Sequence, residues 1–92
     1  MPFYTRLEDA AKSLSTTQED LMELERRSWI AFTHFENTEV TYLRGHQQYR
    51  AKFVISLRDR LGLSPEQISK VLENQKPPYS LSTVQEILAK PA

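Results

Sequence analysis

The segment that most constrains the fold runs from His46 to Glu73, because it contains two helical patterns and a clear turn between them. In its first half apolar residues recur about every four positions, which predicts a helix with one apolar face: Tyr49, Phe53, Val54, Leu57 and Leu61. Gly62 predicts the end of that helix, because glycine readily adopts the left-handed conformation found after helix C-termini. Ser64 and Gln67 then have capping-box spacing, with Pro65 at the first helical position.

A second helix therefore begins at this capping box. Its apolar positions have the spacing of one helical face: Ile68, Val71 and Leu72. Asn74, Lys76 and the Pro77-Pro78 pair predict its end, since proline cannot continue a helix. The segment thus predicts two amphipathic helices that help to close a small core. By itself it indicates no function.

Two shorter helices are predicted before this segment. Thr5 and Glu8 have capping-box spacing, and the apolar face that follows consists of Leu7, Ala10, Ala11 and Leu14. The run 15–17 breaks this helix and supplies the cap of the next one, where either Thr16 with Glu19 or Thr17 with Asp20 can serve. Leu21 and Leu24 are the inward positions of this next helix. Its predicted outer face consists of Gln18, Glu19, Met22, Glu23, Arg26 and Arg27.

A β-hairpin is predicted between the two helical pairs. Residues 29–35 are aromatic and β-branched, 36–38 resemble a turn, and 39–43 alternate polar and apolar residues. Arg44-Gly45 ends the hairpin. After Pro78, the run 82–85 (STVQ) has capping-box spacing, and Val84, Ile87 and Leu88 predict a final short helix.

Size and composition limit the classes of function. The chain has 92 residues, no cysteine and two histidines, His34 and His46. We therefore expect no disulfide, no metal site and no cofactor, and no residue pattern predicts an enzyme. There is no signal-like N-terminal run and no stretch of the roughly 20 apolar residues that a membrane span requires. These features predict a soluble, cytoplasmic protein that does not bind membranes.

Charge is balanced overall but not along the chain. The formal net charge is zero, with twelve basic and twelve acidic residues, yet residues 1–42 carry a net −4 and residues 43–92 a net +4. One interpretation is that the halves neutralise each other within the fold. Another is that they meet between two copies in a homodimer. Charge asymmetry is also typical of proteins with charged partners.

The predicted fold class is mainly α with a small β-hairpin, in the order α-α-β-β-α-α plus a short C-terminal helix. This order and several segments resemble the N-terminal winged helix-turn-helix domain of the MerR family over residues 3–73. The segments are 7–12 (LEDAAK), 17–21 (TQEDL), 25–30 (ERRSWI), 57–59 (LRD) and 62–64 (GLS) with Ile68. The resemblance implies a MerR-like domain over residues 1–76 and an extension over residues 77–92.

Departures from the family pattern concern its DNA contacts. DNA-reading MerR domains begin the second helix with an arginine, whereas this chain has Glu19, Asp20 and Glu23 there. DNA affinity is built largely from lysine and arginine contacts to phosphates, and carboxylates oppose it. This sequence shows neither the wing motif glycine-tyrosine-arginine nor the long dimerising helix of the regulators.

The acidic second helix is similar to that of CbpM-type chaperone modulators, which are MerR-like proteins of about this size. The resemblance implies a regulator that binds the J-domain of a DnaJ-type co-chaperone, whose basic helix suits an acidic surface. The protein-binding residues predicted on this basis are Glu19, Asp20, Met22 and Glu23. The alternative is a DNA-binding transcription regulator without an effector domain, with phosphate contacts from Arg26, Arg27, Arg44 and Arg50.

Overall fold

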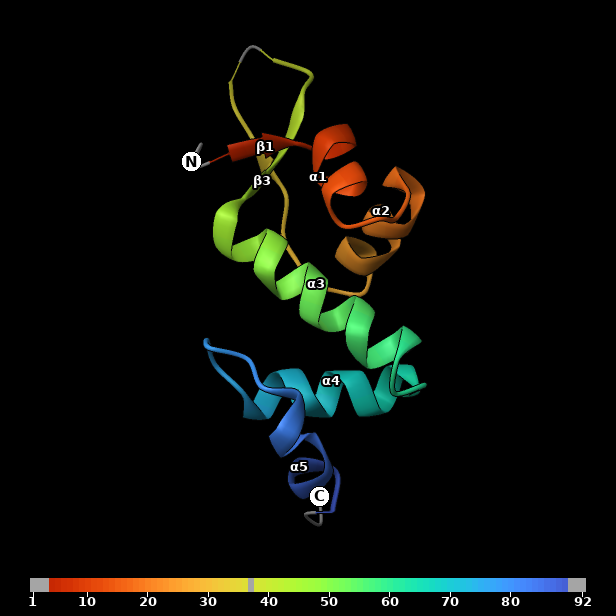
Figure 1. Cartoon of the computed structure of the whole chain (residues 1–92). Coiled ribbons are helices and arrows are strands. Elements are labelled where there is room, and N and C mark those ends of the chain that lie inside the picture. Colours follow the sequence, from red (N-terminus) through yellow and green to blue (C-terminus); the bar gives the residue numbers. More distant parts are fainter. Residues whose placement is uncertain (1–3, 37, 90–92) are drawn as a thin grey trace. The chain divides into compact units, whose positions relative to one another are not determined.

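The computed structural model describes residues 4–36 and 38–89. It is mainly α, with 59% helix, five α-helices and a three-stranded antiparallel sheet in the order β-α-α-β-β-α-α-α (Figure 1). The elements are β1 (Tyr4–Arg6), α1 (Leu7–Ser13), α2 (Gln18–Arg26), β2 (Thr33–His34), β3 (Thr41–Arg44), α3 (Gly45–Asp59), α4 (Pro65–Asn74), the 3₁₀ turn η1 (Leu81–Thr83) and α5 (Val84–Ala89). The predicted mainly α fold with a β-hairpin is confirmed at this level.

The chain divides into two compact units, one ending at Lys52 and one beginning at Phe53, so the boundary falls within α3. In the first unit the buried apolar side chains are Leu7, Ala10, Ala11, Leu21, Leu24, Trp29, Ile30, Leu43 and Ala51. In the second they are Phe53, Val54, Leu57, Ile68, Val71, Leu72, Val84 and Ile87. The division into residues 1–76 and 77–92 stays a prediction.

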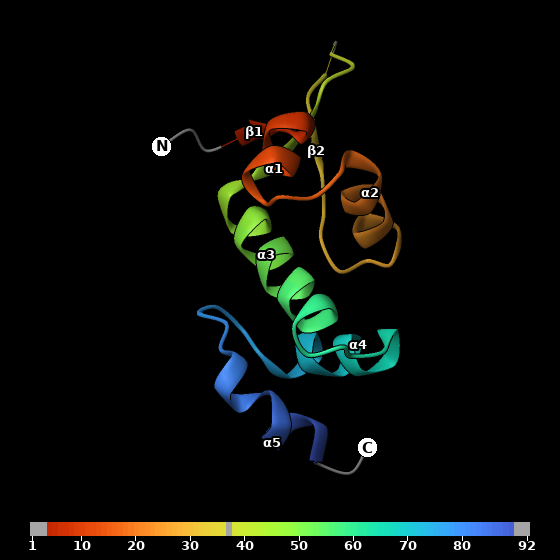
Figure 2. The same cartoon turned by 45° about the vertical axis from the view of Figure 1, so that its right-hand side comes forward.

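The sheet belongs to the first unit and has the strand order β1-β3-β2. β3 is central, pairing antiparallel with β2 as the sequence predicted and also with β1, which it did not predict. The first strand of the hairpin is shorter than the predicted 29–35. Only Thr33–His34 form β2, and Trp29 and Ile30 are buried in the loop that precedes it. In Figures 1 and 2 the sheet lies beside α1, and α1 lies beside α2.

The predicted capping box of α1 is wrong. Thr5 is the middle residue of β1, where it pairs with Leu43, and the N-cap is Arg6, whose side chain makes no capping hydrogen bond. The Thr5 hydroxyl instead accepts a hydrogen bond of 2.8 Å from the amide of Gln48. Strand pairing therefore replaces the local cap. The apolar face of α1 is confirmed for Leu7, Ala10 and Ala11, whereas Leu14 is only half-buried.

The turn and capping box between α3 and α4 are confirmed. Gly62 has a φ of +64°, and the Ser64 hydroxyl accepts from the Gln67 backbone while the Gln67 side chain accepts from the Ser64 N–H. The apolar face predicted for α3 is only partly correct. Its central residues are buried, but Tyr49 is 47% exposed and Leu61 40% exposed. Leu61 lies beyond the end of α3 at Asp59, which takes it off the helical face.

The last helix packs within the second unit, where α5 contacts α4 and the Lys70 ammonium approaches the Leu88 carbonyl at 3.5 Å. Val84 and Ile87 are buried, as the pattern predicted, and Leu88 is half-buried. The predicted cap at Ser82 is wrong. A 3₁₀ turn precedes α5, and the hydroxyl at its N-cap is that of Ser80, which accepts from the Ser82 N–H.

Candidate functional site

The candidate protein-binding surface lies on α2, which begins with a side-chain cap. The Thr17 hydroxyl accepts from the Asp20 N–H at 3.0 Å, which decides between the two caps that the sequence allowed. Leu21 and Leu24 are almost fully buried, and this fixes which side of the helix faces the core. Residues at i and i+4 share a helix face, so Glu19 and Glu23 both lie on the outward side.

The first turn of α2 contains two acidic residues, Glu19 and Asp20. Glu19 is exposed, and among the described residues it has no hydrogen-bond or ion-pair partner. Asp20 is half-buried, and its carboxylate accepts a hydrogen bond of 2.5 Å from the Thr16 hydroxyl. Carboxylates at this position also interact favourably with the positive end of the helix dipole. Met22 follows with 45% of its surface exposed, which places an apolar contact beside the charges.

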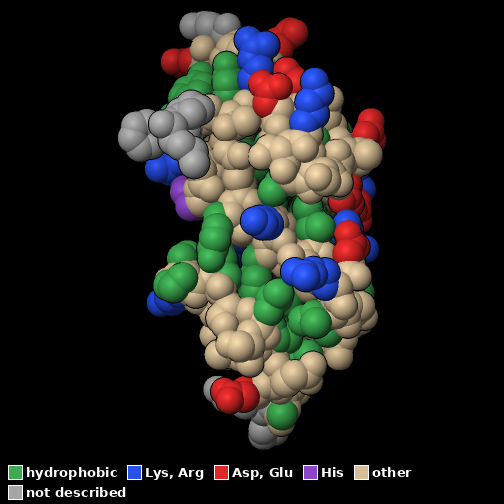
Figure 3. All heavy atoms as spheres, viewed as in Figure 1, with side chains coloured by type: hydrophobic (Ala, Val, Ile, Leu, Met, Phe, Trp, Pro, Cys, Tyr) green, Lys and Arg blue, Asp and Glu red, His purple; other side chains and the backbone are tan. Residues whose placement is uncertain are grey.

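Glu23 differs from the other predicted binding residues because it is engaged within the helix. Its carboxylate forms ion pairs with Arg26 and, at 3.1 Å, with Nε of Arg27. In Figure 3 acidic and basic side chains lie side by side on the right, over α2. Spacings of three and four residues permit both pairs, so the sequence contained this signal. Glu23, predicted as a protein-binding residue, therefore also stabilises its own helix through these two ion pairs.

The arginines proposed for DNA binding are mostly engaged in the fold. Arg27 lies over the Trp29 ring with its guanidinium carbon 5.4 Å from the ring centroid, in addition to its pair with Glu23. Arg50 donates from Nε to the Trp29 carbonyl, joining α3 to the loop that follows α2. Arg44 is exposed, and its side chain has no partner among the described residues. Of these four arginines, Arg26, Arg27 and Arg50 make internal contacts, and within the described part of the chain only Arg44 makes none.

A second surface is a group of three aromatic side chains on the sheet: Tyr4, Phe35 and Tyr42. Tyr4 contacts Phe35 edge-to-face with ring centroids 5.0 Å apart, and Phe35 contacts Tyr42 at 5.4 Å. Tyr4 and Tyr42 complete the group at 6.5 Å. Because Tyr4 is 36% and Phe35 43% exposed, the group remains open to solvent. Phe35 and Tyr42 belong to the same hairpin, whereas Tyr4 is distant in sequence and joins them only because β1 pairs with β3.

Within residues 4–36 and 38–89, no group of three or more histidine or acidic side chains is arranged to hold a metal ion. In the same part of the chain, no helix is both long and apolar enough to cross a membrane.

Comparison with known proteins gave no match to a family model, to a curated protein or to a solved structure.

Proposed function

We propose that this chain is a non-catalytic regulatory binding module with a MerR-like winged helix-turn-helix fold, and that it binds the J-domain of a DnaJ-type co-chaperone as CbpM-type modulators do. The contact surface is the first turn of α2 with Met22. The observation that carries the proposal is the exposed carboxylate of Glu19, which has no partner among the described residues, beside the exposed side chain of Met22. A charged group next to an apolar one suits a basic amphipathic helix.

The contacts of the arginines favour this function over DNA binding. In a winged helix-turn-helix protein that reads DNA, α2 would approach the phosphates, and Glu19 would then repel them. Arg26 and Arg27 are already paired with Glu23, and Arg50 is bonded to a backbone carbonyl. Phosphate binding would have to compete with these contacts.

The test is a charge reversal confined to the unpaired part of the surface. Glu19→Lys should weaken binding to a J-domain several-fold or more, because it slows the encounter and removes complementary charge. Glu25→Lys is the matched control: Glu25 is exposed on the same helix, about a third of a turn away from Glu19 at 100° per residue. Glu23 is left unchanged, since its reversal would also break two internal ion pairs.

Isothermal titration calorimetry with a purified J-domain, beside thermal melts of each variant, would measure both effects. If Glu19→Lys and Glu25→Lys bind as the wild type does while remaining folded, α2 is not the contact surface. If no variant and no wild-type protein binds the J-domain, the proposed partner is wrong.

A further inference from the structure

The second surface with an unexplained composition is the solvent-facing side of the sheet in the first unit. Side chains on a strand alternate between the two faces, and directly paired residues share a face. Leu43 is fully buried, so its partner Thr5 faces the core with it. The neighbouring pairs, Tyr4 with Arg44 and Arg6 with Tyr42, must therefore face outward.

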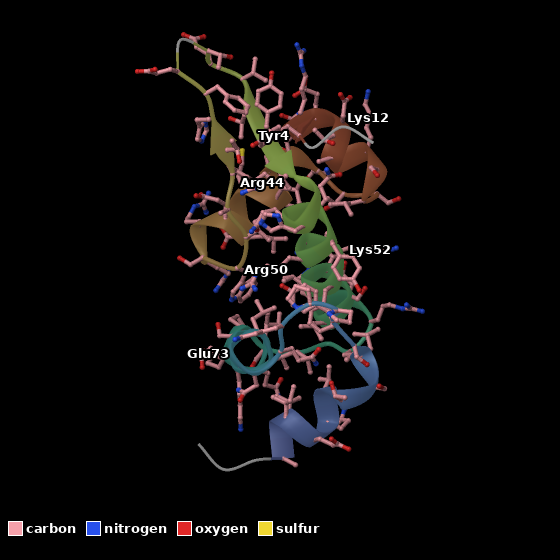
Figure 4. The ribbon with its side chains drawn as sticks, turned by 90° about the vertical axis from the view of Figure 1, so that its left-hand side faces the viewer. Tyr4, Lys12, Arg44, Arg50, Lys52 and Glu73 are labelled. Atoms are coloured by element: carbon pink, nitrogen blue, oxygen red, sulfur yellow. The ribbon has the colours of Figure 1, made fainter. Side chains whose placement is uncertain are left out.

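This register places aromatic and cationic side chains in alternating positions. Tyr4 lies opposite Arg44, and Arg6 lies opposite Tyr42, while Phe35 joins the two tyrosines through its ring contacts. We call these residues the outward sheet face: Tyr4, Arg6, Phe35, Tyr42 and Arg44. Figure 4 shows Tyr4 and Arg44 on the sheet and Lys12 on the separate helix α1.

The outward sheet face has features of a binding surface that the fold itself does not use. Two of its aromatic rings are more than a third exposed, so their burial is incomplete. Arg44 has no side-chain partner among the described residues, and Arg6 has only a long contact of 3.9 Å to Glu8. Tyrosine and arginine are enriched among the residues that dominate binding energy at protein interfaces.

We propose that the outward sheet face binds an acidic peptide segment of a partner protein. Carboxylates of the segment pair with Arg6 and Arg44, for which arginine offers a bidentate geometry. Apolar side chains of the segment pack on the aromatic group. This surface is separate from α2, and its arginines are opposite in charge to the carboxylates of the first turn of that helix.

The surrounding charges favour a peptide over a nucleic acid. Glu36 follows Phe35 directly and Glu39 lies on the other side of the hairpin turn, and both are exposed. A single-stranded nucleic acid carries a phosphate at every nucleotide and would meet these carboxylates. A peptide can place its acidic residues opposite the two arginines and neutral residues near the turn. A ligand whose negative charges lie only opposite the two arginines therefore matches the outward sheet face better than one that is charged at every unit.

Amide NMR titrations with short blocked peptides test this proposal. The probe alternates glutamate with phenylalanine, and its control carries lysine in place of glutamate. The acidic peptide should shift the signals of residues 4–6, 33–36 and 41–44, and the lysine peptide should not. Arg44→Glu should weaken binding of the acidic peptide by about tenfold, whereas Lys12→Glu, the same reversal at an exposed residue of α1, should leave it unchanged.

A second substitution tests the aromatic part of the outward sheet face. Phe35→Ser, at a side chain already 43% exposed, should weaken binding of the acidic peptide without lowering the melting temperature appreciably.

A thymidine oligonucleotide that binds this face more tightly than the peptide would overturn the proposal in favour of nucleic acid. Concentration-dependent sedimentation that Arg44→Glu abolishes would show the face to be an interface between copies of this chain. Equal peptide binding by Arg44→Glu and Lys12→Glu would remove the arginine from the site.

Discussion

At the scale of single residues, Trp29 shows how one side chain and its carbonyl determine the roles of two arginines. Its ring is buried at 6% exposure under the guanidinium of Arg27, and its carbonyl accepts from Arg50. Both contacts engage a guanidinium group that a phosphate would have to bind instead. Interactions of a cation with a tryptophan face are worth about 0.5–1 kcal/mol at exposed sites, and hydrogen bonds from charged donors about 1.5–3 kcal/mol. These arginines are therefore explained by the fold.

Phe53 is a buried aromatic residue of the second unit. Its side chain is 7% exposed and stacks on Tyr79 with ring centroids 4.8 Å apart and planes inclined by 12°. Phe53→Ala should reduce the free energy of unfolding by about 3–5 kcal/mol, because it removes a buried ring and leaves a cavity. Urea denaturation would measure this. Leu61→Ala, at a side chain 40% exposed, should change the same quantity by only about half a kcal/mol; similar midpoints for both variants would contradict the assigned burial.

At the scale of elements, the two glycines of the chain should respond oppositely to the same substitution. Gly62 has a φ of +64° after α3, and Gly45 is the first residue of α3; a Cβ at either position would meet no atom within 4 Å. Gly62→Ala should destabilise the protein by about 1–2 kcal/mol, the cost of a left-handed conformation in an L-residue. Gly45→Ala should stabilise it by about 0.4–1 kcal/mol through reduced unfolded-state entropy. Thermal melts that shift in the same direction for both would refute this distinction.

Elements with their own local signals could be predicted from the sequence. Thr17 and Ser64 cap α2 and α4 as their spacing predicted, and Leu21 with Leu24 occupies the buried face. Strand β1 could not be predicted, since three residues show no periodicity and their partner β3 is far along the chain. For the same reason the helical interpretation of Thr5 was wrong: strand pairing outcompeted a cap that is locally reasonable.

The two candidate surfaces also differ in how far local sequence patterns predict them. The acidic residues of α2 could be located from helical spacing alone, and the pairs of Glu23 with Arg26 and Arg27 follow from the same spacing. The bond from Arg50 to the Trp29 carbonyl has no sequence signature, because any residue has a carbonyl. The outward sheet face required the strand register, which local sequence patterns do not contain.

At the scale of the whole molecule, balanced charge gives no long-range attraction for a polyanion. The formal net charge is zero, so DNA binding would depend on local clusters of unengaged arginines and lysines. Among the arginines considered for DNA contact, Arg44 alone has a side chain without a partner in the described residues. A single phosphate contact provides little affinity, since each contact contributes separately to counterion release.

We therefore expect no sequence-selective DNA complex in an anisotropy titration with mixed genomic fragments at about 0.15 M salt. Any binding should be weak and should decrease steeply with added salt, because only phosphate contacts would produce it. Arg44→Glu should abolish this residual binding, whereas Glu25→Lys, which adds positive charge to exposed α2, should not reduce it. A selective complex tighter than about a micromolar would require Arg26, Arg27 or Arg50 to exchange its internal contact for a phosphate. That result would place DNA above the co-chaperone as the partner.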